Sequence, residues 1–264
     1  MQIPAESWRR AIEERHSRRS FGDKRIESET LVRLESLCET ISTSADGVRV
    51  VVVPEMSAGV FKGIVGAYGK VNGAPSGLLF IGNTATTHVD ERVGYHGEAA
   101  VLEATSLGLD TCWVGGFFSR DKAEAYAVLS PDEQIFAVSP LGYAVASSTF
   151  TEKMMKGMAG SHKRKPLEEI APGIESGGWP EWAVDGVNAA RLAPSAVNRQ
   201  PWRFRLEDGA VVVYLDEPKD TYRIAKRLDC GIAMLHFEAA ALSKEVPGEW
   251  TYLEGPDVAR YTPR

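Results

Sequence analysis

The stretch most informative about this chain is Ala193-Pro194-Ser195-Ala196-Val197-Asn198-Arg199-Gln200-Pro201-Trp202. A helix is expected before it at about 180–192, and a strand is expected from Trp202 onward. Pro194 fixes the backbone of the loop between them, because the proline ring locks φ. Gln200-Pro201-Trp202 then leads into the strand. Taken by itself, the stretch also fits an arbitrary loop that contains proline and tryptophan.

The composition is that of an ordinary globular protein. The chain has 264 residues, of which 44% are hydrophobic and 25% are charged, so it can bury a core without disulfides or metals. This length fits one large domain or two closely packed ones. The formal net charge of −6 argues against non-specific binding to nucleic acid.

Three cysteines lie far apart, at Cys38, Cys112 and Cys230, and no Cys-x-x-Cys pair is present. This pattern fits a reducing compartment and argues against a disulfide framework or a structural zinc site. His88 and His96 lack companions at zinc spacing, so we expect no metal. The polar N-terminus has no signal-like segment, and no apolar run is long enough to cross a bilayer. We therefore expect a cytoplasmic protein with no membrane partner.

Helices and short strands alternate along the chain, which is typical of an α+β fold. The third helix is expected to end at Gly108, because glycine is favoured just past a helix C-terminus. A weak internal repeat relates Gly97-Glu98-Ala99 to Gly231-Ile232-Ala233, since each opens an apolar helix. We expect helices at about 4–16, 28–42, 91–108, 121–129, 180–192 and 228–243, and strands at 48–53, 77–82, 112–117, 135–138, 202–207 and 210–216.

Several segments resemble the FMN-dependent nitroreductase family, and together they cover about residues 10–240. The stretch 193–202 resembles that family's APSAxNxQPW segment, and Arg18-Arg19-Ser20 resembles the Arg-Arg-Ser motif that closely precedes it there. Further similarity lies in Thr111-Cys112-Trp113-Val114-Gly115-Gly116-Phe117, in Pro140-Leu141-Gly142-Tyr143 and in Lys163-Arg164-Lys165-Pro166-Leu167-Glu168-Glu169.

In the family, the first two motifs meet around one flavin across a dimer interface, whereas here they lie far apart in one chain. The resemblance therefore implies a nitroreductase-like α+β fold in which two fused half-domains form an intramolecular pseudo-dimer. Residues 1–165 would carry most FMN contacts, and residues 166–264 would be a degenerate half carrying the 193–202 loop. The first half reads Glu39-Thr40-Ile41-Ser42-Thr43-Ser44 where its own loop would be. One flavin site per chain is therefore expected, and the protein is expected to function as a monomer.

The resemblance implies FMN as the cofactor and assigns residues to its polar parts. Arg18, Arg19 and Ser20 would hold the phosphate, which guanidinium groups bind bidentately, and Arg164 would return to it. Lys70 would reach the pyrimidine edge, where a cation stabilises the negative charge of the reduced ring. Taken alone, the first motif also fits a solvated charged run, and Lys70 also fits an exposed loop lysine.

The remaining contacts implied by the resemblance surround the ring. Trp113, Val114, Gly115 and Gly116 would pass beside it, because two glycines let a backbone approach a planar ligand closely. A backbone N–H of Gly115 or Gly116 would lie near N5, the atom that accepts the hydride. A tight turn beside a buried tryptophan is the structural alternative. From the other half, the ring would meet Pro194, Ser195 and Asn198.

Two departures from the family pattern affect the phosphate contacts. Many members have a basic residue two positions after the serine, where this chain has Gly22. Lys24 and Arg25 are close enough in sequence to compensate. The family's asparagine before the lysine at position 70 is also absent. These departures bear on individual contacts more than on the identity of the cofactor.

The resemblance implies an oxidoreductase that uses NAD(P)H and FMN. NAD(P)H would pass a hydride to the flavin, and a nitroaromatic, quinone or similar electrophilic small molecule would then take the electrons in a ping-pong cycle. No catalytic side chain is needed, because the cofactor carries the chemistry. No Gly-x-Gly-x-x-Gly precedes a helix, so a Rossmann nicotinamide site is not expected. Ene reduction or dehalogenation on the same scaffold stays open, and so does a flavin-binding sensor or carrier without turnover.

Overall fold

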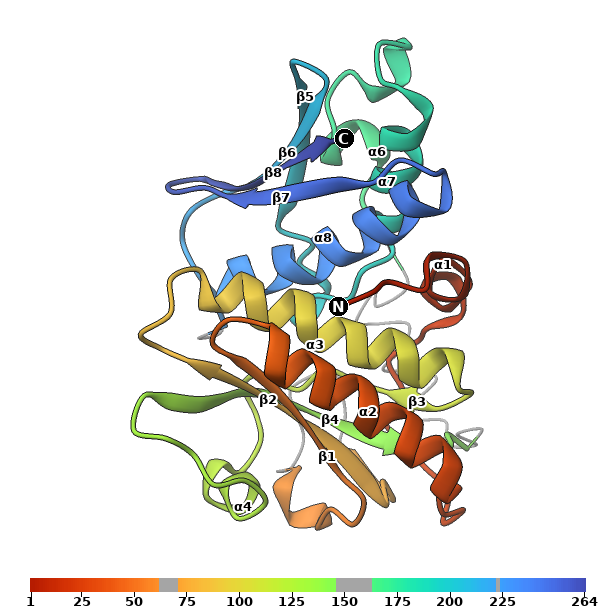
Figure 1. Ribbon diagram of the computed structural model, residues 1–264, viewed down its shortest axis with the longest axis vertical. Helices are drawn as coiled ribbons and strands as arrows, with labels where there is room; N and C mark the ends of the chain where they lie inside the picture. The colour runs from red at the N-terminus through yellow and green to blue at the C-terminus, as the bar shows by residue number, and fades with distance from the viewer. Residues whose placement is uncertain (62–70, 146–162, 222–223) are drawn as a thin grey trace.

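Two four-stranded antiparallel sheets lie on either side of a central helix pair, α3 (Val89–Ser106) and α8 (Lys226–Ser243) (Figure 1). The structure is a computed structural model, and it describes residues 1–61, 71–145, 163–221 and 224–264. The other elements up to residue 145 are α1 (Ala5–Glu14), α2 (Ser28–Ser44), β1 (Val48–Val53), η1 (Ala58–Val60), β2 (Ser76–Asn83), β3 (Asp110–Thr111), α4 (Arg120–Glu124) and β4 (Glu133–Gly142). Those after residue 163 are α6 (Leu167–Ile170), η3 (Ile174–Ser176), α7 (Glu181–Arg191), η4 (Ala196–Asn198), β5 (Trp202–Glu207), β6 (Ala210–Leu215), β7 (Gly248–Tyr252) and β8 (Asp257–Pro263).

The two sheets have the same connectivity. One has the strand order β1-β2-β4-β3 and the other β5-β6-β8-β7. In each half the long central helix follows the second strand, so that α3 comes after β2 and α8 after β6. Each ladder between the two middle strands also shifts register once, at Phe80/Ile81 in the first sheet and at Val213/Tyr214 in the second. The α+β class predicted from the sequence is confirmed, and the same strand–helix plan occurs twice.

The helices α3 and α8 meet at two glycines in equivalent positions. Each helix has 18 residues, and its sixth residue is the glycine, Gly94 in α3 and Gly231 in α8. A Cβ on Gly94 would lie 2.0 Å from the carbonyl oxygen of Leu228, and one on Gly231 would lie 2.1 Å from that of Glu91. Leu228 and Glu91 are each the third residue of their helix, so the contact is reciprocal, as in a two-fold interface. Only glycine permits this backbone approach.

One hydrophobic core contains both central helices and apolar residues of both sheets. Helix α1 joins this core through Trp8, whose Nε1 donates a hydrogen bond to Glu103 of α3 at 2.9 Å. A smaller core includes Ile81 of β2 together with Phe61 and Phe118. Both faces of β2 are therefore buried, which explains its continuous apolar sequence. In the part of the chain that the structure describes, no helix combines the length and apolar character needed to cross a membrane.

The connections between strands differ in length between the halves. Residues 54–75 join β1 to β2, and residues 112–132 join β3 to β4. In the second half, Asp208-Gly209 alone joins β5 to β6, and residues 253–256 join β7 to β8. Asp208 and Gly209 have φ values of 50° and 75°, as a tight two-residue hairpin requires. The repeated plan therefore carries long insertions between strands only in its first copy.

Several sequence-based expectations about secondary structure are wrong. Residues 112–117 do not form a strand, and only Val114 pairs there, with Val138 of β4. The chain instead bends at Gly115-Gly116. The helix expected at 121–129 ends at Glu124. The strands β7 and β8 were not expected, because they are short and flank a turn at Gly255-Pro256. The weak repeat was also three residues out of register, since the counterpart of Gly231 is Gly94 rather than residue 97.

Gly94→Ala is expected to lower the free energy of unfolding by about 3 kcal/mol, because two helix backbones must separate to admit the methyl group. Gly231→Ala is expected to have a similar effect through the reciprocal contact. Gly178→Ala is the control, since a Cβ there would meet nothing within 4 Å, and we expect a change within about 1 kcal/mol. Urea unfolding followed by circular dichroism measures all three. Equal stability of the Gly94 and Gly178 variants would contradict the described crossing.

Candidate functional site

Both halves of the chain line one cleft, and the space in and directly in front of it, part of which is open solvent, measures about 1010 Å³. The first half contributes Ser17, Arg19 and residues 112–117, and the second contributes residues 194–197, Ile224 and Asp229. The residues expected at the cofactor that lie in this wall are Arg19, Trp113, Val114, Gly115, Gly116, Pro194 and Ser195. Arg18, Ser20, Arg164 and Asn198 are not part of the wall, and Lys70 lies outside the described residues.

The segment after α1 runs in an extended conformation along the cleft. Ser17 pairs with Thr111 of β3, so successive side chains alternate between the two faces of the segment. Ser17 and Arg19 line the cleft. Arg18, on the other face, is 45% exposed, and its Nε lies 3.6 Å from Asp110. Of the Arg18-Arg19-Ser20 motif, Arg19 therefore lies in the cleft wall, and Ser17 lies there with it.

Arg15 precedes Ser17 by two residues, as Ser17 precedes Arg19, and it was not among the residues predicted from the sequence. Its side chain is 4% exposed, and its Nε is buried without a hydrogen-bond partner among the described residues. The nearest described carboxylate is that of Glu98, at 3.8 Å from Nε. Burial lowers the pKa of Arg15, and the negative charge of Glu98 opposes this shift. All five residues of the stretch 15–19 are polar, so the sequence contains no apolar–polar alternation that would have indicated Arg15 and Ser17.

Glu98 is a fully buried acceptor that orients one wall of the cleft. Its Oε2 accepts a hydrogen bond from Trp113 Nε1 at 2.7 Å, and the Trp113 ring stacks on Phe80 with centroids 4.1 Å apart. Its Oε1 lies 2.8 Å from Nε2 of His236 on α8, and the other ring nitrogen of His236 faces the carbonyl oxygen of Ala189 at 3.1 Å. Both ring nitrogens of His236 therefore face oxygen atoms, which fixes the orientation of the ring.

The 193–202 loop is joined to the segment beginning at Lys163 by several hydrogen bonds. Arg164 Nη1 donates to Asn198 Oδ1 at 2.9 Å, and Asn198 Nδ2 donates to the carbonyl oxygen of Lys163 at 2.9 Å. The amide of Gln200 accepts from the backbone N–H of Lys165 at 2.9 Å. Arg164 and Asn198, both expected at the cofactor, are therefore in direct contact beside the cleft wall.

The backbone of this loop adopts an unusual conformation. Val197 and Asn198 have φ values of 49° and 58°. Asparagine tolerates this left-handed region, whereas a β-branched residue there costs on the order of 1–3 kcal/mol. The loop retains the conformation because Ser195 Oγ accepts the backbone N–H of Gln200 at 2.9 Å and because Asn198 is bonded on both sides. Strain of this kind is typical of ligand-binding loops.

Arginines gather where the two halves meet beside the cleft. Burial, together with the positive charges of Arg15 and Arg191, lowers the pKa of Arg164 to about 10. Arg191 Nε donates to the carbonyl oxygen of Lys165 at 2.7 Å, which keeps it next to the same segment. The mutual repulsion of these guanidinium groups would be relieved by an anion, and phosphate is the anion that guanidinium groups bind best.

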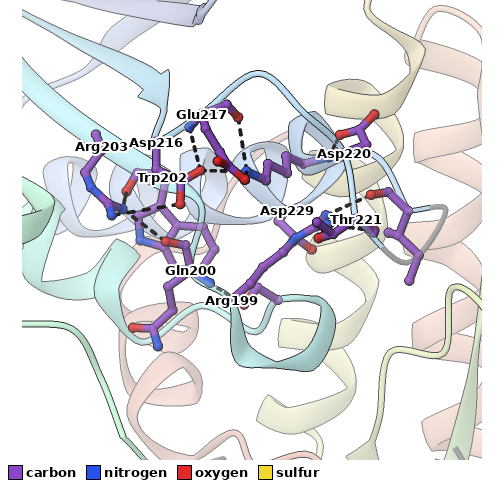
Figure 2. A network of polar contacts seen from close by, with 12 residues as sticks. Arg199, Gln200, Trp202, Arg203, Asp216, Glu217, Asp220, Thr221 and Asp229 are labelled. Atoms are coloured by element: carbon purple, nitrogen blue, oxygen red, sulfur yellow. Dashed lines mark hydrogen bonds and ion pairs between the residues drawn. The ribbon is translucent and has the colours of Figure 1, made fainter.

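A buried ion pair lies on the α8 side of the cleft (Figure 2). Asp229 is 2% exposed and lines the cleft, and its carboxylate accepts a hydrogen bond from Arg199 Nε at 2.7 Å. Burial raises the pKa of Asp229 to about 6, although the charge of Arg199 opposes this shift. Sequence reasoning missed Asp229 because only the tertiary fold brings it to the loop. It missed Arg199 because the position is variable in the motif.

A family model described as "Putative TM nitroreductase" matches residues 8–241. The chain belongs to this nitroreductase family. Its members are oxidoreductases, and this general class therefore applies to the protein. The nitroreductase-like fold predicted from the sequence is confirmed by this match and by the structural likeness that follows. No protein of curated function matches the chain significantly.

Solved structures of other nitroreductases resemble this one. A protein from Thermotoga maritima, described as a putative nitroreductase, has a TM-score of 0.62 at 22% identity, and the match covers 96% of this chain and 92% of that chain. A nitroreductase family protein from Clostridium difficile 630 has a TM-score of 0.44 at 20% identity, covering 64% and 96%. An FMN-dependent nitroreductase from Clostridium difficile R20291 has a TM-score of 0.42 at 17% identity, covering 53% and 88%. The first of these likenesses shows the fold of this nitroreductase.

The raised pKa of Asp229 predicts a pH dependence of stability. The folded carboxyl binds its proton more tightly than the unfolded one, whose pKa is near 3.8. The free energy of unfolding should therefore fall, relative to that of Asp229→Asn, as pH rises from about 4 to about 6. The expected fall is about 3 kcal/mol, because each pKa unit corresponds to about 1.4 kcal/mol. Urea unfolding of both proteins across this range measures the difference, in which other titrating groups cancel. Parallel curves would contradict the prediction.

Proposed function

We propose that the cleft binds FMN and that the protein transfers electrons from NAD(P)H to a small electrophilic acceptor. The observation that carries this proposal is the meeting in one cleft of Gly115 and Gly116 from the first half with Pro194 and Ser195 from the second. These segments were singled out by their resemblance to flavin-binding motifs, and they are far apart in sequence. Membership of the nitroreductase family supports the same proposal.

The charged side chains beside the cleft fit the phosphate of FMN. Arg15 has a buried Nε without a described hydrogen-bond partner, and burying such a group unpaired is costly. Arg164 and Arg191 lie close enough for their charges to interact. A phosphate dianion would neutralise this cluster and accept several charge-assisted hydrogen bonds. With Ser17 and Arg19 in the cleft wall, we propose Arg15, Ser17, Arg19 and Arg164 as the phosphate ligands.

FMN, when bound, would supply the redox chemistry, accepting a hydride from NAD(P)H and returning electrons to a nitroaromatic, quinone or similar acceptor. The protein's own residues bind, orient and exclude water. Trp113 is oriented by its hydrogen bond to Glu98, and Gly115 and Gly116 let their backbone N–H groups come close to a planar ring. Phe117 adds an apolar side chain to the cleft.

We further propose that one chain contains one complete site and functions as a monomer in the cytoplasm. The repeated plan and the reciprocal Gly94–Gly231 contact support an internal pseudo-dimer with halves of 1–165 and 166–264. The cleft wall includes residues from both long strand connections of the first half and from the loop between α7 and β5. At the pseudo-equivalent position these segments are short, with residues 45–47, Asp208-Gly209 and 253–256. A second cleft of the same kind cannot be built from them.

The visible spectrum of the purified protein tests the cofactor directly. We expect a yellow protein that contains one FMN per chain and is bleached by NADH or NADPH under anaerobic conditions. Addition of menadione should restore the colour. A yellow protein that neither nucleotide bleaches would support a flavin sensor or carrier instead. A protein that binds no FMN on titration would refute the proposal.

Arg164→Ala and Arg19→Ala are each expected to weaken FMN binding roughly tenfold to a hundredfold, since each removes about 1.5–3 kcal/mol of charge-assisted hydrogen bonding. Arg18→Ala should have a smaller effect than Arg19→Ala, because Arg18 lies outside the cleft wall and beside Asp110. Arg264→Ala is the control, as Arg264 is 66% exposed and paired with Glu249. Flavin fluorescence titration measures the four affinities. A larger loss of FMN affinity in Arg18→Ala than in Arg19→Ala would instead support Arg18 as a phosphate ligand.

A further inference from the structure

Arg199 joins three segments that form the second-half wall of the cleft. Its Nε donates to Asp229 of α8 at 2.7 Å (Figure 2). Its terminal nitrogens donate to the carbonyl and hydroxyl oxygens of Thr221, both at 3.0 Å, and to the carbonyl oxygen of Ile224 at 3.0 Å. The second oxygen of Asp229 accepts the backbone N–H of Ala196 at 3.1 Å. One ion pair therefore sets the positions of α8, of the loop after α7, and of Thr221 and Ile224.

The Arg199–Asp229 pair is shielded from water and rigidly held. The two side chains are only 9% and 3% exposed. Further along the chain, Lys226 Nζ donates to Asp216 at 2.9 Å, and its backbone N–H donates to Asp220 at 2.8 Å. The carbonyl oxygen of Ile224 is thus bonded to Arg199, and Lys226, two residues further along, is bonded to Asp216 and Asp220.

The side chain of Ile224 meets the first half of the protein at Gly115. A Cβ on Gly115 would lie only 3.2 Å from Ile224 Cδ1. Both residues line the cleft, so their contact forms the part of the cleft wall where the two halves touch. Isoleucine offers neither charge nor a hydrogen bond, and it is stiff at χ1 because it is β-branched. It can therefore affect a ligand only through its volume and position.

We propose that Ile224 is a specificity-determining residue that limits the size of the electron acceptor beside Gly115, and that Arg199 and Asp229 are its positioning residues. This inference rests on the proposed function. The acceptor class favoured is a flat molecule with one ring, such as 1,4-benzoquinone, over a two-ring molecule such as menadione. The ion pair acts on selectivity because it holds the carbonyl group of Ile224, not because it touches the acceptor.

Ile224→Ala provides the primary test, since this side chain is only partly buried and its truncation should not prevent folding. The value of kcat/KM is measured for menadione and for 1,4-benzoquinone with the FMN-loaded enzyme. We expect the menadione-to-benzoquinone ratio to rise about tenfold, the effect of freeing a few methyl groups of space in a pocket. FMN affinity is measured in parallel, so that the ratio is compared at saturating FMN in both proteins. An unchanged ratio would overturn the role of Ile224.

Arg199→Lys tests the positioning role, because lysine keeps the charge but cannot reach Asp229, Thr221 and Ile224 together. Arg205→Lys is the matched control. Arg205 is likewise paired with an aspartate, Asp257, in its case through two bonds at 2.7 and 2.8 Å, but it is not part of the cleft wall. We expect Arg199→Lys to shift the ratio in the same direction as Ile224→Ala, and Arg205→Lys to leave it unchanged.

A double variant completes the test of the positioning role. Adding Arg199→Lys to Ile224→Ala should change the ratio no further, because both substitutions act through the same side chain. An independent, additive shift would show that Arg199 does not act through Ile224. Asp229→Asn, which keeps the shape of the side chain, should reproduce the shift of Arg199→Lys, and an unchanged ratio in both variants would overturn the positioning role.

The two levels of the proposal fail in distinguishable ways. Wild-type protein that binds no FMN, or whose bound FMN is not reduced by NAD(P)H, would end the proposed function. If the wild-type protein turns over both quinones and the variants keep its menadione-to-benzoquinone ratio of kcat/KM, only the inference about Ile224 and Arg199 is refuted.

Discussion

The backbone contact between α3 and α8 is the constraint on which the rest of the structure depends. Gly94 and Gly231 let each helix touch the main chain of the other. At this separation, His236 of α8 reaches Glu98 of α3 at 2.8 Å, and Tyr95 of α3 reaches Glu238 of α8 at 2.7 Å. A wider spacing would leave these buried groups unpaired, which is expensive in a low-dielectric core. The close crossing therefore also sets the position of the cleft between the halves.

Buried charged side chains connect the two helices to the walls of the cleft. The carboxylate of Glu98 contacts Trp113 in the cleft wall and His236 from the opposite half, and Arg15 Nε lies 3.8 Å from it. On the second-half side, Asp229 plays a similar part for Arg199 and the loop after α7. Each carboxylate is almost fully buried and contacts two partners, which come from two different elements at Glu98 and from the single 193–202 loop at Asp229. Such pairs add less to stability than to the choice of one arrangement, which is what a binding site requires.

Unequal connections distinguish the two copies of a shared plan. The sheets agree in strand order and even in the place of the register shift. The first half nevertheless carries the long connections 54–75 and 112–132, whereas the second carries the long loop before β5. Segments of all three line the same cleft. The two halves of one chain, unlike two identical subunits, need not have the same sequence, so each can contribute different segments to one cleft.

The sequence alone determined the features that depend on neighbours along the chain. The helices expected at about 4–16, 28–42 and 228–243 correspond to α1, α2 and α8, and the strands expected at 202–207 and 210–216 form the β5–β6 hairpin. The resemblance of 193–202 to a family motif indicated a binding loop. Only the tertiary structure decided that 112–117 is a bent cleft wall, that Arg15 and Ser17 accompany Arg19, and that Arg199 meets Asp229. The physical reason is that these features depend on burial and on hydrogen bonds between residues distant in sequence. Local patterns record which residues prefer a helix or strand, but they do not record which partners packing will bring within 3 Å.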